Sequence, residues 1–365
     1  MCLALRAAGV SPLIATTNAD GDGILDVPLG TVTNWHGTEA IFFQRQWSEA
    51  FKYSRGLGSW LERHIGEFQV AHLHGPLSYS SLVAGACAYR HGVPFIVRPL
   101  GTLDRWSLQQ KARKKQLLMP FVARMLRRAA AVHCTSAEEL REVSDAFGLQ
   151  NGITIPLGVQ SLFTEEDTHD DEERRRDPYV LALSRLHPVK NLEALIEAFA
   201  DLEPADARRG WRLVIGGSGD AAYADALDSI IERRNASAFV TRIGWMSGRA
   251  KQALVRGASV FALPSHHENF GVGLVEAMAA GVPALVSGGV HLSAEIERAG
   301  AGWVVAGNRE SIRAALAEAI ADTDGRWRRA NGARKFAVAF AWPVVAAQLV
   351  DLYDRLAGTR VRGVA

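Results

Sequence analysis

The sequence predicts an α/β protein built from two doubly wound domains, and three observations support this. The chain has 365 residues, the length of about two domains at roughly 100–200 residues each. Short apolar runs alternate with helical stretches throughout, which is typical of parallel sheets with helices on both faces. The alternation stops once, in a polar stretch between Gly158 and Pro178, and then resumes.

Eleven apolar runs read as strands, and each is followed by a turn or a helix start. Those before the polar stretch are Pro12–Thr16, Glu39–Phe43, Val70–His74, Pro94–Arg98, Ala131–Thr135 and Ile153–Pro156. Those after it are Tyr179–Leu183, Trp211–Ile215, Phe239–Ile243, Val260–Leu263 and Pro283–Val286. We therefore expect an N-terminal domain over residues 1–157, a linker at 158–178, a C-terminal domain over 179–340 and a final helix at 341–357. Ligands of such sheets bind at the carboxyl ends of the strands, and the cleft between two domains is the expected site.

Composition excludes several classes of protein. The chain has 41 Lys and Arg residues and 39 Asp and Glu residues, so its net charge is +2. This near balance argues against a globally basic nucleic-acid-binding protein. Cys2, Cys87 and Cys134 are odd in number and form no CxxC pair, which argues against a disulfide framework and a cysteine zinc site. No apolar run approaches the roughly 18 residues of a membrane span. We expect a cytoplasmic protein, with attachment to a membrane surface left open.

The most informative segment spans residues 264–283. It leaves an apolar strand, turns at Gly271 and continues as a helix, whose N-terminus would offer unpaired N–H groups and a positive dipole end to an anion. Glu268 precedes this helix and Glu276 lies about 7 Å along it, so the two carboxylates flank the anion site. One could hold a sugar and the other a ribose, as a nucleotide sugar requires. By spacing alone, a solvated loop glutamate and an ordinary helix glutamate remain the simpler interpretation.

This segment closely resembles the motif of the retaining glycosyltransferases of family 4, whose members have the two-domain GT-B fold. A second segment, Ser184–Asn191, resembles the family's loop in which an Arg and a Lys bind the donor diphosphate, here Arg185 and Lys190. Two cations at that point can neutralise a departing nucleoside diphosphate without a metal ion. Residues 215–220 and 243–254 also agree with the family, and the resemblance covers about residues 70–356.

The resemblance implies roles for individual residues. Glu268 is expected to contact the transferred sugar and Glu276 the ribose, and backbone amides of residues 269–272 are expected beside sugar and phosphate. The implied donor-binding residues are Arg185, Lys190, Asn269, Phe270, Gly271, Val272 and Glu276. His74 matches a histidine near the reacting centre, with His72 as the alternative and a half-buried, hydrogen-bonded residue as the competing interpretation. Retention in the family is explained by attack on the face of the leaving phosphate, so we name no nucleophile.

On the acceptor side, the loop after residue 97 resembles one found in polysaccharide-building members of the family. The acceptor-side candidates are Arg98, Gly101 and Thr102. The resemblance weakens at the start of the chain. Family members begin with a strand, a Gly-rich turn and a helix, whereas Met1–Gly9 already resembles the tail of that helix. Since the first strand is normally central, we expect a gap in the first sheet. Two origins are considered for it: the start of translation was placed downstream of the true one, or the chain is a degraded copy of a family member.

Residues 105–137 contain eight basic side chains and no acidic one. The basic residues are Arg105, Lys111, Arg113, Lys114, Lys115, Arg124, Arg127 and Arg128. We expect Pro120 to open a second helix, with Phe121, Met125 and Ala129 on one face and arginines on the other. Such a surface over 105–128 could lie on anionic lipid near a lipid-linked acceptor, or could be a solvated helix face. Nucleic acid is disfavoured because interleaved stacking aromatics are lacking.

Together these observations predict a retaining hexosyltransferase with a UDP- or GDP-sugar as donor and a polysaccharide or lipid-linked glycan as acceptor, as in exopolysaccharide or lipopolysaccharide biosynthesis. No metal or other cofactor is expected, and the protein is expected in the cytoplasm, with peripheral attachment to the inner face of the cell membrane left open. The final helix is expected to cross back to the first domain, as it does in this fold. Two alternatives remain: a nucleotide-sugar epimerase on the same fold, and a non-catalytic nucleotide-binding partner subunit.

Overall fold

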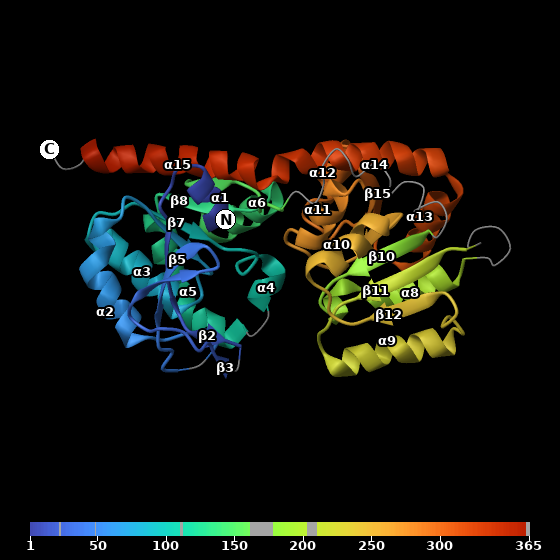
Figure 1. The fold of residues 1–365 in the computed structure, drawn as a ribbon, viewed down its shortest axis with the longest axis horizontal. Coiled ribbons are helices and arrows are strands. Elements are labelled where there is room, and N and C mark those ends of the chain that lie inside the picture. The colour runs from blue at the N-terminus through green and yellow to red at the C-terminus, as the bar shows by residue number, and fades with distance from the viewer. Residues whose placement is uncertain (22, 48, 110–111, 161–177, 203–209, 363–365) are drawn as a thin grey trace. The chain divides into compact units, whose positions relative to one another are not determined.

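The structure is a computed structural model that describes every residue except 22, 48, 110–111, 161–177, 203–209 and 363–365. The chain divides into two compact units (Figure 1). Unit 1 contains Met1–Gly158 and Trp342–Ala365, and unit 2 contains Val159–Ala341. Most of the linker predicted at 158–178 lies outside the described residues. The last helix therefore belongs to the same unit as the beginning of the chain.

Unit 1 holds two separate larger sheets and one small one. The first sheet has the order β1-β5-β4, and comprises β1 (Leu13–Thr17), β5 (Thr38–Phe43) and β4 (Val32–Trp35). The second has the order β6-β7-β8-β9, and comprises β6 (Ala71–His74), β7 (Phe95–Arg98), β8 (Ala131–Cys134) and β9 (Gly152–Thr154). All neighbours in these sheets are parallel except β4 and β5. The small sheet pairs β2 (Ala19–Asp20) with β3 (Gly23–Ile24).

The division of unit 1 into two sheets occurs between β1 and β6. In the described part of the chain, β1 pairs only with β5, and β6 pairs only with β7. Four of the five β1 residues are only half-buried, whereas every residue of β7 and β8 is buried. This arrangement agrees with the expected gap in the first sheet.

Helices cover both faces of the second sheet of unit 1 (Figure 1). They are α1 (Cys2–Ala7), α2 (Arg55–His64), α3 (Tyr79–Arg90), α4 (Arg105–Gln109), α5 (Ala112–Arg128), α6 (Ala137–Phe147) and α15 (Trp342–Arg362), and the 3-10 helix η1 spans Ile65–Glu67. On one face, residues of α2, α3, α5 and α6 form a core that also joins the two larger sheets. On the other face, Leu5 of α1 and Leu349 of α15 pack against Ile96 and Ala131. The first and last helices of the chain therefore cover the same face.

The prediction that a new helix begins at Pro120 is wrong. Pro120 lies inside α5 and does not open a new helix. Met125 and Ala129 are buried as expected, but Phe121 is 63% exposed. The reason is that the buried stripe of the helix is completed by Val122 and Leu126, so that position 121 falls at its solvent edge. Of the eight basic residues counted in this region, Lys111, Arg113 and Lys114 lie where the structure describes no side chains.

Unit 2 contains one sheet of six parallel strands in the order β12-β11-β10-β13-β14-β15. The strands are β10 (Tyr179–Leu183), β11 (Arg212–Gly216), β12 (Val240–Ile243), β13 (Val260–Leu263), β14 (Ala284–Ser287) and β15 (Gly302–Val305). The helices are α8 (Leu192–Ala200), α9 (Ala221–Arg233), α10 (Gly248–Gly257), α11 (Val272–Ala279), α12 (Ser293–Arg298), α13 (Arg309–Ala321) and α14 (Thr323–Ala337), with 3-10 helices η3 (Pro188–Lys190) and η4 (Val338–Phe340). Apolar residues of β10, β11, β13 and their covering helices form the core.

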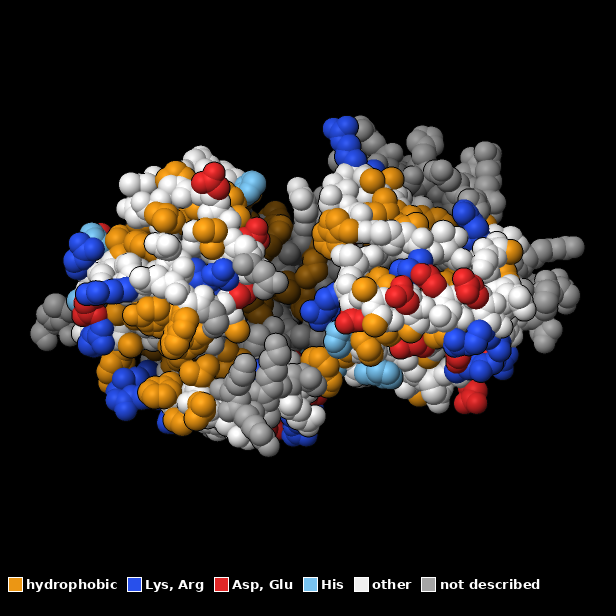
Figure 2. Space-filling view, turned by 90° about the horizontal axis from the view of Figure 1, so that it is seen from below, with side chains coloured by type: hydrophobic (Ala, Val, Ile, Leu, Met, Phe, Trp, Pro, Cys, Tyr) orange, Lys and Arg blue, Asp and Glu red, His pale blue; other side chains and the backbone are white. Residues whose placement is uncertain are grey.

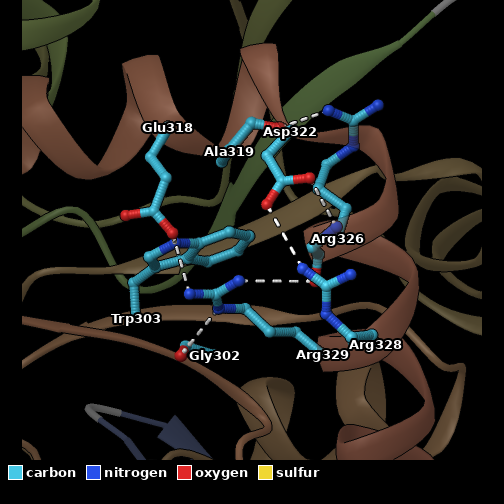
Figure 3. A network of polar contacts seen from close by, with 9 residues as sticks. Gly302, Trp303, Glu318, Ala319, Asp322, Arg326, Arg328 and Arg329 are labelled. Carbon is cyan, nitrogen blue, oxygen red and sulfur yellow. Dashed lines mark hydrogen bonds and ion pairs between the residues drawn. The ribbon is translucent and has the colours of Figure 1, made fainter.

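A polar network fixes α14 against the edge strand β15 (Figure 3). The indole N–H of Trp303 donates to Glu318 over 2.9 Å, and Arg329 donates to the same carboxylate over 2.8 Å. The Arg329 guanidinium also lies 4.3 Å from the centre of a Trp303 ring, a cation–π contact. Asp322 accepts a hydrogen bond from the backbone N–H of Gly325 over 2.7 Å, which caps α14. None of the described helices is long and apolar enough to cross a membrane.

Candidate functional site

The sheet of unit 2 has a single switch point, between β10 and β13. Strands β11 and β12 lie on one side of β10, and β13, β14 and β15 lie on the other. Open parallel sheets bind ligands outside the carboxyl ends of the strands at such a point. Arg185 and Lys190 follow β10, and Glu268 follows β13. The two segments singled out in the sequence therefore come from the two strands that flank the switch point.

The loop after β10 is held by the loop after β11. Leu186 donates its backbone N–H to Ser218 O over 3.0 Å, and Asp220 donates to Leu186 O over 3.1 Å. A Cβ atom on Gly219 would lie 2.2 Å from Leu186 O, closer than real contacts allow, so only glycine fits. Arg185, next to this bridge, is exposed. Its backbone is therefore fixed while its guanidinium can meet a ligand.

The Lys190 turn is also tied to the segment that follows β13. Asn191 has a left-handed φ of 56°, which asparagine tolerates better than most residues. Its amide donates to Pro264 O over 3.0 Å and to Gly307 O over 2.7 Å. The backbone N–H of His266 donates to Val189 O over 2.8 Å. These bonds bring the two motifs into contact.

Lys190 and Glu268 form an ion pair across that contact. Their side chains are only 11% and 20% exposed, so the pair lies in a partly desolvated place where charge interactions are stronger than in water. Glu268 is held by its backbone, because its N–H donates to Gly289 O over 3.0 Å and its carbonyl accepts from His291 N–H over 2.9 Å. A lysine and a glutamate that lie 78 residues apart in the sequence are thus in direct contact in the folded chain.

The start of α11 completes this side of the site. Gly271, the residue before the helix, has a φ of 76°, a conformation that favours glycine. Phe270 is 2% exposed and packs edge-on against Phe340 with ring centres 5.6 Å apart. Its side chain therefore belongs to the core, and only its backbone can take the role expected for it. Val272 is 44% exposed at the first position of the helix.

Glu276 lies in the second turn of α11 and has a partner that the sequence did not reveal. Lys251 of α10 places its Nζ 2.5 Å from Glu276 Oε2. Lys251 lies within residues 243–254, a segment that agrees with the family but for which the sequence predicted no role. Nothing in its local sequence indicates the contact, which depends on α10 packing beside α11. Each of the two candidate carboxylates is thus held by a lysine from another element.

The candidates of unit 1 gather at the carboxyl ends of β6 and β7. His74 is paired in register with Arg98, and Gly75 donates its N–H to Arg98 O over 3.0 Å. The His74 side chain reaches solvent, yet burial, together with the charge of Arg98, lowers its pKa to about 4. His72 is bound by Tyr353 of α15, with 2.7 Å between Nδ1 and the hydroxyl oxygen. His72 is therefore a half-buried residue that is already hydrogen-bonded, and His74 is the histidine open to a ligand.

The loop that follows Arg98 has an unusual backbone. Leu100 has a φ of 55° and Gly101 a φ of 73°, and the left-handed conformation is unfavourable for leucine. Glu139, which is fully buried, accepts hydrogen bonds from Gly101 N–H over 2.5 Å and from Thr135 N–H over 2.6 Å. The Thr102 hydroxyl donates to Pro99 O over 2.7 Å, so the Thr102 side chain points toward the backbone of its own loop.

Glu139 supports the candidate loop after β7 and was not among the residues predicted from the sequence. The sequence feature that could have drawn attention to Glu139 is Ser136, three residues earlier. This spacing is typical of a capping box at a helix N-terminus. Ser136 does cap α6 by accepting from Glu139 N–H over 3.1 Å. In a capping box the glutamate carboxylate would accept from the backbone N–H of the N-cap residue. The Glu139 carboxylate instead binds the loop after β7. Among the described residues, no group of three or more His, Cys, Asp or Glu is placed to hold a metal ion.

Comparison with known proteins identifies the family of the chain. Residues 164–336 match the family described as glycosyl transferases group 1, and residues 1–158 match the glycosyl transferase 4-like domain. The D-inositol 3-phosphate glycosyltransferase of Corynebacterium glutamicum is 33% identical over 62% of this chain and 57% of its own length. The GDP-mannose-dependent alpha-(1-6)-phosphatidylinositol dimannoside mannosyltransferase of Mycobacterium tuberculosis is 31% identical over 75% of this chain and 71% of its own length.

A solved structure shows the same fold. Sucrose-phosphate synthase from Thermosynechococcus elongatus superimposes with a TM-score of 0.77 at 20% identity, over 98% of this chain and 91% of the other. The chain spans only 50–57% of the length of the first three curated relatives it matches. The two-domain α/β architecture is that of GT-B glycosyltransferases. By its two matching domains and its relatives, the chain belongs to the group 1 glycosyltransferases, with an N-terminal domain of the family 4 type.

Proposed function

We propose that the protein is a retaining glycosyltransferase that moves a hexose from a nucleotide-diphosphate sugar to a glycan or lipid-linked acceptor. The observation that carries this proposal is the meeting of Lys190 and Glu268 at the switch point of the unit 2 sheet. A cation for the diphosphate and a carboxylate for the sugar hydroxyls are thereby held next to each other. Glu276, in the second turn of α11, the helix that follows Glu268, is the candidate ligand of the ribose.

In the proposed reaction, an acceptor hydroxyl oxygen bonds to the anomeric carbon as the bond from that carbon to the diphosphate oxygen breaks. The hydroxyl proton passes to the leaving diphosphate on the same face. Negative charge builds up on the diphosphate, and preformed cations at that place stabilise the transition state more than the ground state. Arg185 and Lys190 supply two positive charges, so the proposal requires no metal ion. The mycobacterial relative, whose name includes GDP-mannose, supports a nucleotide-sugar donor.

The experiment is a transfer assay with purified protein, UDP- and GDP-sugars, and glycan or polyprenyl-linked acceptors, without added divalent metal and with a chelator present. We expect release of one nucleoside diphosphate that depends on the acceptor, and a product with the anomeric configuration of the donor by NMR. Conversion of the donor in the absence of any acceptor would favour the epimerase instead. Donor binding without turnover, for every acceptor tried, would favour a non-catalytic subunit.

We further propose that α5 lies on an anionic membrane surface on the cytoplasmic side. Leu117 and Phe121 are 76% and 63% exposed, and Arg124 is exposed one turn beyond them. Positions 117, 121, 124 and 128 share one helix face, and Arg128 stacks 3.8 Å over the half-exposed ring of Tyr89. The view of unit 1 in Figure 2 shows hydrophobic side chains directly beside Lys and Arg side chains. Two apolar side chains flanked by arginines fit the boundary between headgroups and acyl chains.

Charge removal on α5 should weaken this binding. Replacing Arg124 and Arg127 with glutamine is expected to lower the partition onto vesicles containing phosphatidylserine by roughly 30-fold, since each cation contributes about 1 kcal/mol near such a surface. Co-sedimentation with these vesicles measures the effect. The matched control is Arg233→Gln/Arg234→Gln, two arginines at the end of α9 in unit 2, which should leave the partition unchanged. Equal binding of the α5 variant and the unsubstituted chain would contradict the proposal.

A further inference from the structure

The second sheet of unit 1 carries an unexpected row of polar side chains on one face. This polar cluster consists of His72 and His74 of β6, Arg98 of β7 and His133 of β8. It continues the apolar row of Ile96 and Ala131 that α1 and α15 cover. Side chains at such positions are normally apolar, because both faces of a parallel sheet are covered. The cluster therefore requires an explanation.

Half-buried His72 and buried His133 are hydrogen-bonded to each other and to neighbouring groups. His133 Nε2 lies 2.7 Å from Ile155 O, and a carbonyl can only accept, so this nitrogen carries the proton. In the neutral ring His133 Nδ1 is then an acceptor, and it lies 3.3 Å from His72 Nε2, which must donate. His72 Nδ1 in turn accepts from the Tyr353 hydroxyl over 2.7 Å. Burial keeps both rings neutral, because it lowers the pKa of His133 to about 3 and that of His72 well below its usual value.

Arg98 is the member of the cluster whose charge is not compensated. It is only 3% exposed, and its Nε has no hydrogen-bond partner. Within the described part of the chain, its one side-chain hydrogen bond runs from a terminal nitrogen to Met1 Sδ at 3.6 Å, a weak acceptor. No carboxylate of the described residues lies within ion-pair distance of it. Burial lowers its pKa to about 10, so the guanidinium remains charged at neutral pH.

The carboxylate that acts electrostatically on Arg98 is bound to other groups. Glu139 favours the charged form of Arg98, but its carboxylate accepts from Gly101 N–H and from the backbone and hydroxyl of Thr135. It holds the loop after β7 and does not pair with Arg98. His72 and His133 cannot compensate this charge either, because their rings are neutral and their nitrogens bind one another, Tyr353 and Ile155. A buried cation without a partner is unfavourable in a protein interior unless a ligand supplies the counter-charge.

The position of Arg98 indicates where that ligand would come from. It is the last residue of β7, at the carboxyl ends of parallel strands, where this class of sheet binds ligands. His74 lies beside it in register and reaches solvent. The strained turn at Leu100 and Gly101 follows directly, and such conformations gather at ligand sites.

We propose that Arg98 binds an oxyanion, a phosphate or a carboxylate, carried by the acceptor, with His74 contributing a hydrogen bond at the solvent edge. This inference rests on the proposed function, because it assigns the acceptor of that reaction to the class of anionic sugars. The guanidinium suits this role, since its planar array of N–H donors matches both kinds of oxyanion.

The test is a calorimetric titration of the full-length chain with glucose 6-phosphate, glucuronate and neutral glucose. It uses an Arg185→Ala/Lys190→Ala background, so that anions do not bind at the donor loop. We expect one of the two anions to bind more tightly than glucose, the phosphate arm identifying a sugar phosphate and the carboxylate arm a uronic acid. Adding Arg98→Gln should lower the affinity for that anion at least tenfold, and Arg98→Lys should lower it less. The affinity for glucose should not change in either variant.

Thermal melting separates this role from a structural one. If Arg98 is an unpaired cation awaiting a ligand, Arg98→Gln should melt at or above the temperature of its parent, and only the parent should be stabilised by the anion. Equal anion affinity with and without Arg98 would overturn the inference, as would a folded chain that binds neither anion. Failure of the proposed function would look different, because nucleotides would not bind the unsubstituted chain while the anion still did.

Discussion

Replacing Lys190 with alanine is expected to lower kcat for sugar transfer by roughly 10²- to 10³-fold, the usual cost of removing one preformed charge from a transition-state site. The reason is the position of Lys190, which is mostly buried at the switch point and paired with Glu268. When the donor binds, its diphosphate would take over this cation as the bond to the sugar breaks. The measurement is the rate of nucleoside diphosphate release at saturating donor.

Two controls separate this loss from unfolding or from a general charge effect. Lys335→Ala removes an exposed lysine from the last turn of α14 in the same unit and should leave kcat unchanged. Lys190→Ala leaves the Glu268 carboxylate without its cation, which destabilises a partly buried pair. The double variant Lys190→Ala/Glu268→Gln should therefore melt above Lys190→Ala while remaining inactive. Wild-type turnover by Lys190→Ala would contradict the assignment.

Acidification is expected to destabilise unit 1 well before its carboxylates titrate. His133 is fully buried, and its pKa falls from the usual 6.5 to about 3. Above pH 6.5 it is neutral in both the folded and the unfolded chain and contributes nothing to pH dependence. Below pH 6.5 the unfolded chain takes up a proton that the folded chain refuses, so the free energy of unfolding falls by about 1.4 kcal/mol per pH unit. His72 adds a change of the same sign.

Urea denaturation between pH 6.5 and 5 measures this slope, and hydrogen exchange of β7 and β8 assigns the transition to unit 1. The expected loss from His133 alone is about 2 kcal/mol over that interval. His133→Gln can still donate to Ile155 O and has no group that titrates, so its slope should be smaller by about 1.4 kcal/mol per pH unit. The control is His36→Asn, at an exposed turn position with a φ of 48° that asparagine also tolerates. An unchanged slope in His133→Gln would show that another group controls acid stability.

Local pattern was sufficient to predict most of the fold. Strands β10 and β13 were predicted at their observed bounds, Tyr179–Leu183 and Val260–Leu263, because both are short apolar runs followed by turn residues. Four strands were not predicted. β2 (Ala19–Asp20) and β3 (Gly23–Ile24) are only two residues long each, too short for a recognisable apolar run, and the other two were missed for physical reasons. β4 (Val32–Trp35) is largely exposed and antiparallel to β5, so it has no apolar run. β15 (Gly302–Val305) is an edge strand with only two buried residues.

The candidate site was predicted in part, and its contacts were not. Motif resemblance located Lys190 and Glu268, but their ion pair depends on two loops that meet only in the folded sheet. The partner of His72 is Tyr353, 281 residues away on α15, and no local signal links them. Arg98 was identified as an acceptor-side residue from its loop. Its uncompensated charge became visible only when burial and the carboxylates around it were known.

The most direct test of the central claim is hydrogen–deuterium exchange of the full chain with and without UDP and GDP. The account predicts that one of these nucleotides slows exchange at residues 184–191 and 268–276 together, because the two segments would hold one diphosphate. Lys190→Ala should abolish the protection of both segments, and Lys335→Ala should not. Protection of only one segment, protection confined to other parts of the chain, or no protection by either nucleotide in a cooperatively folded sample would contradict the account.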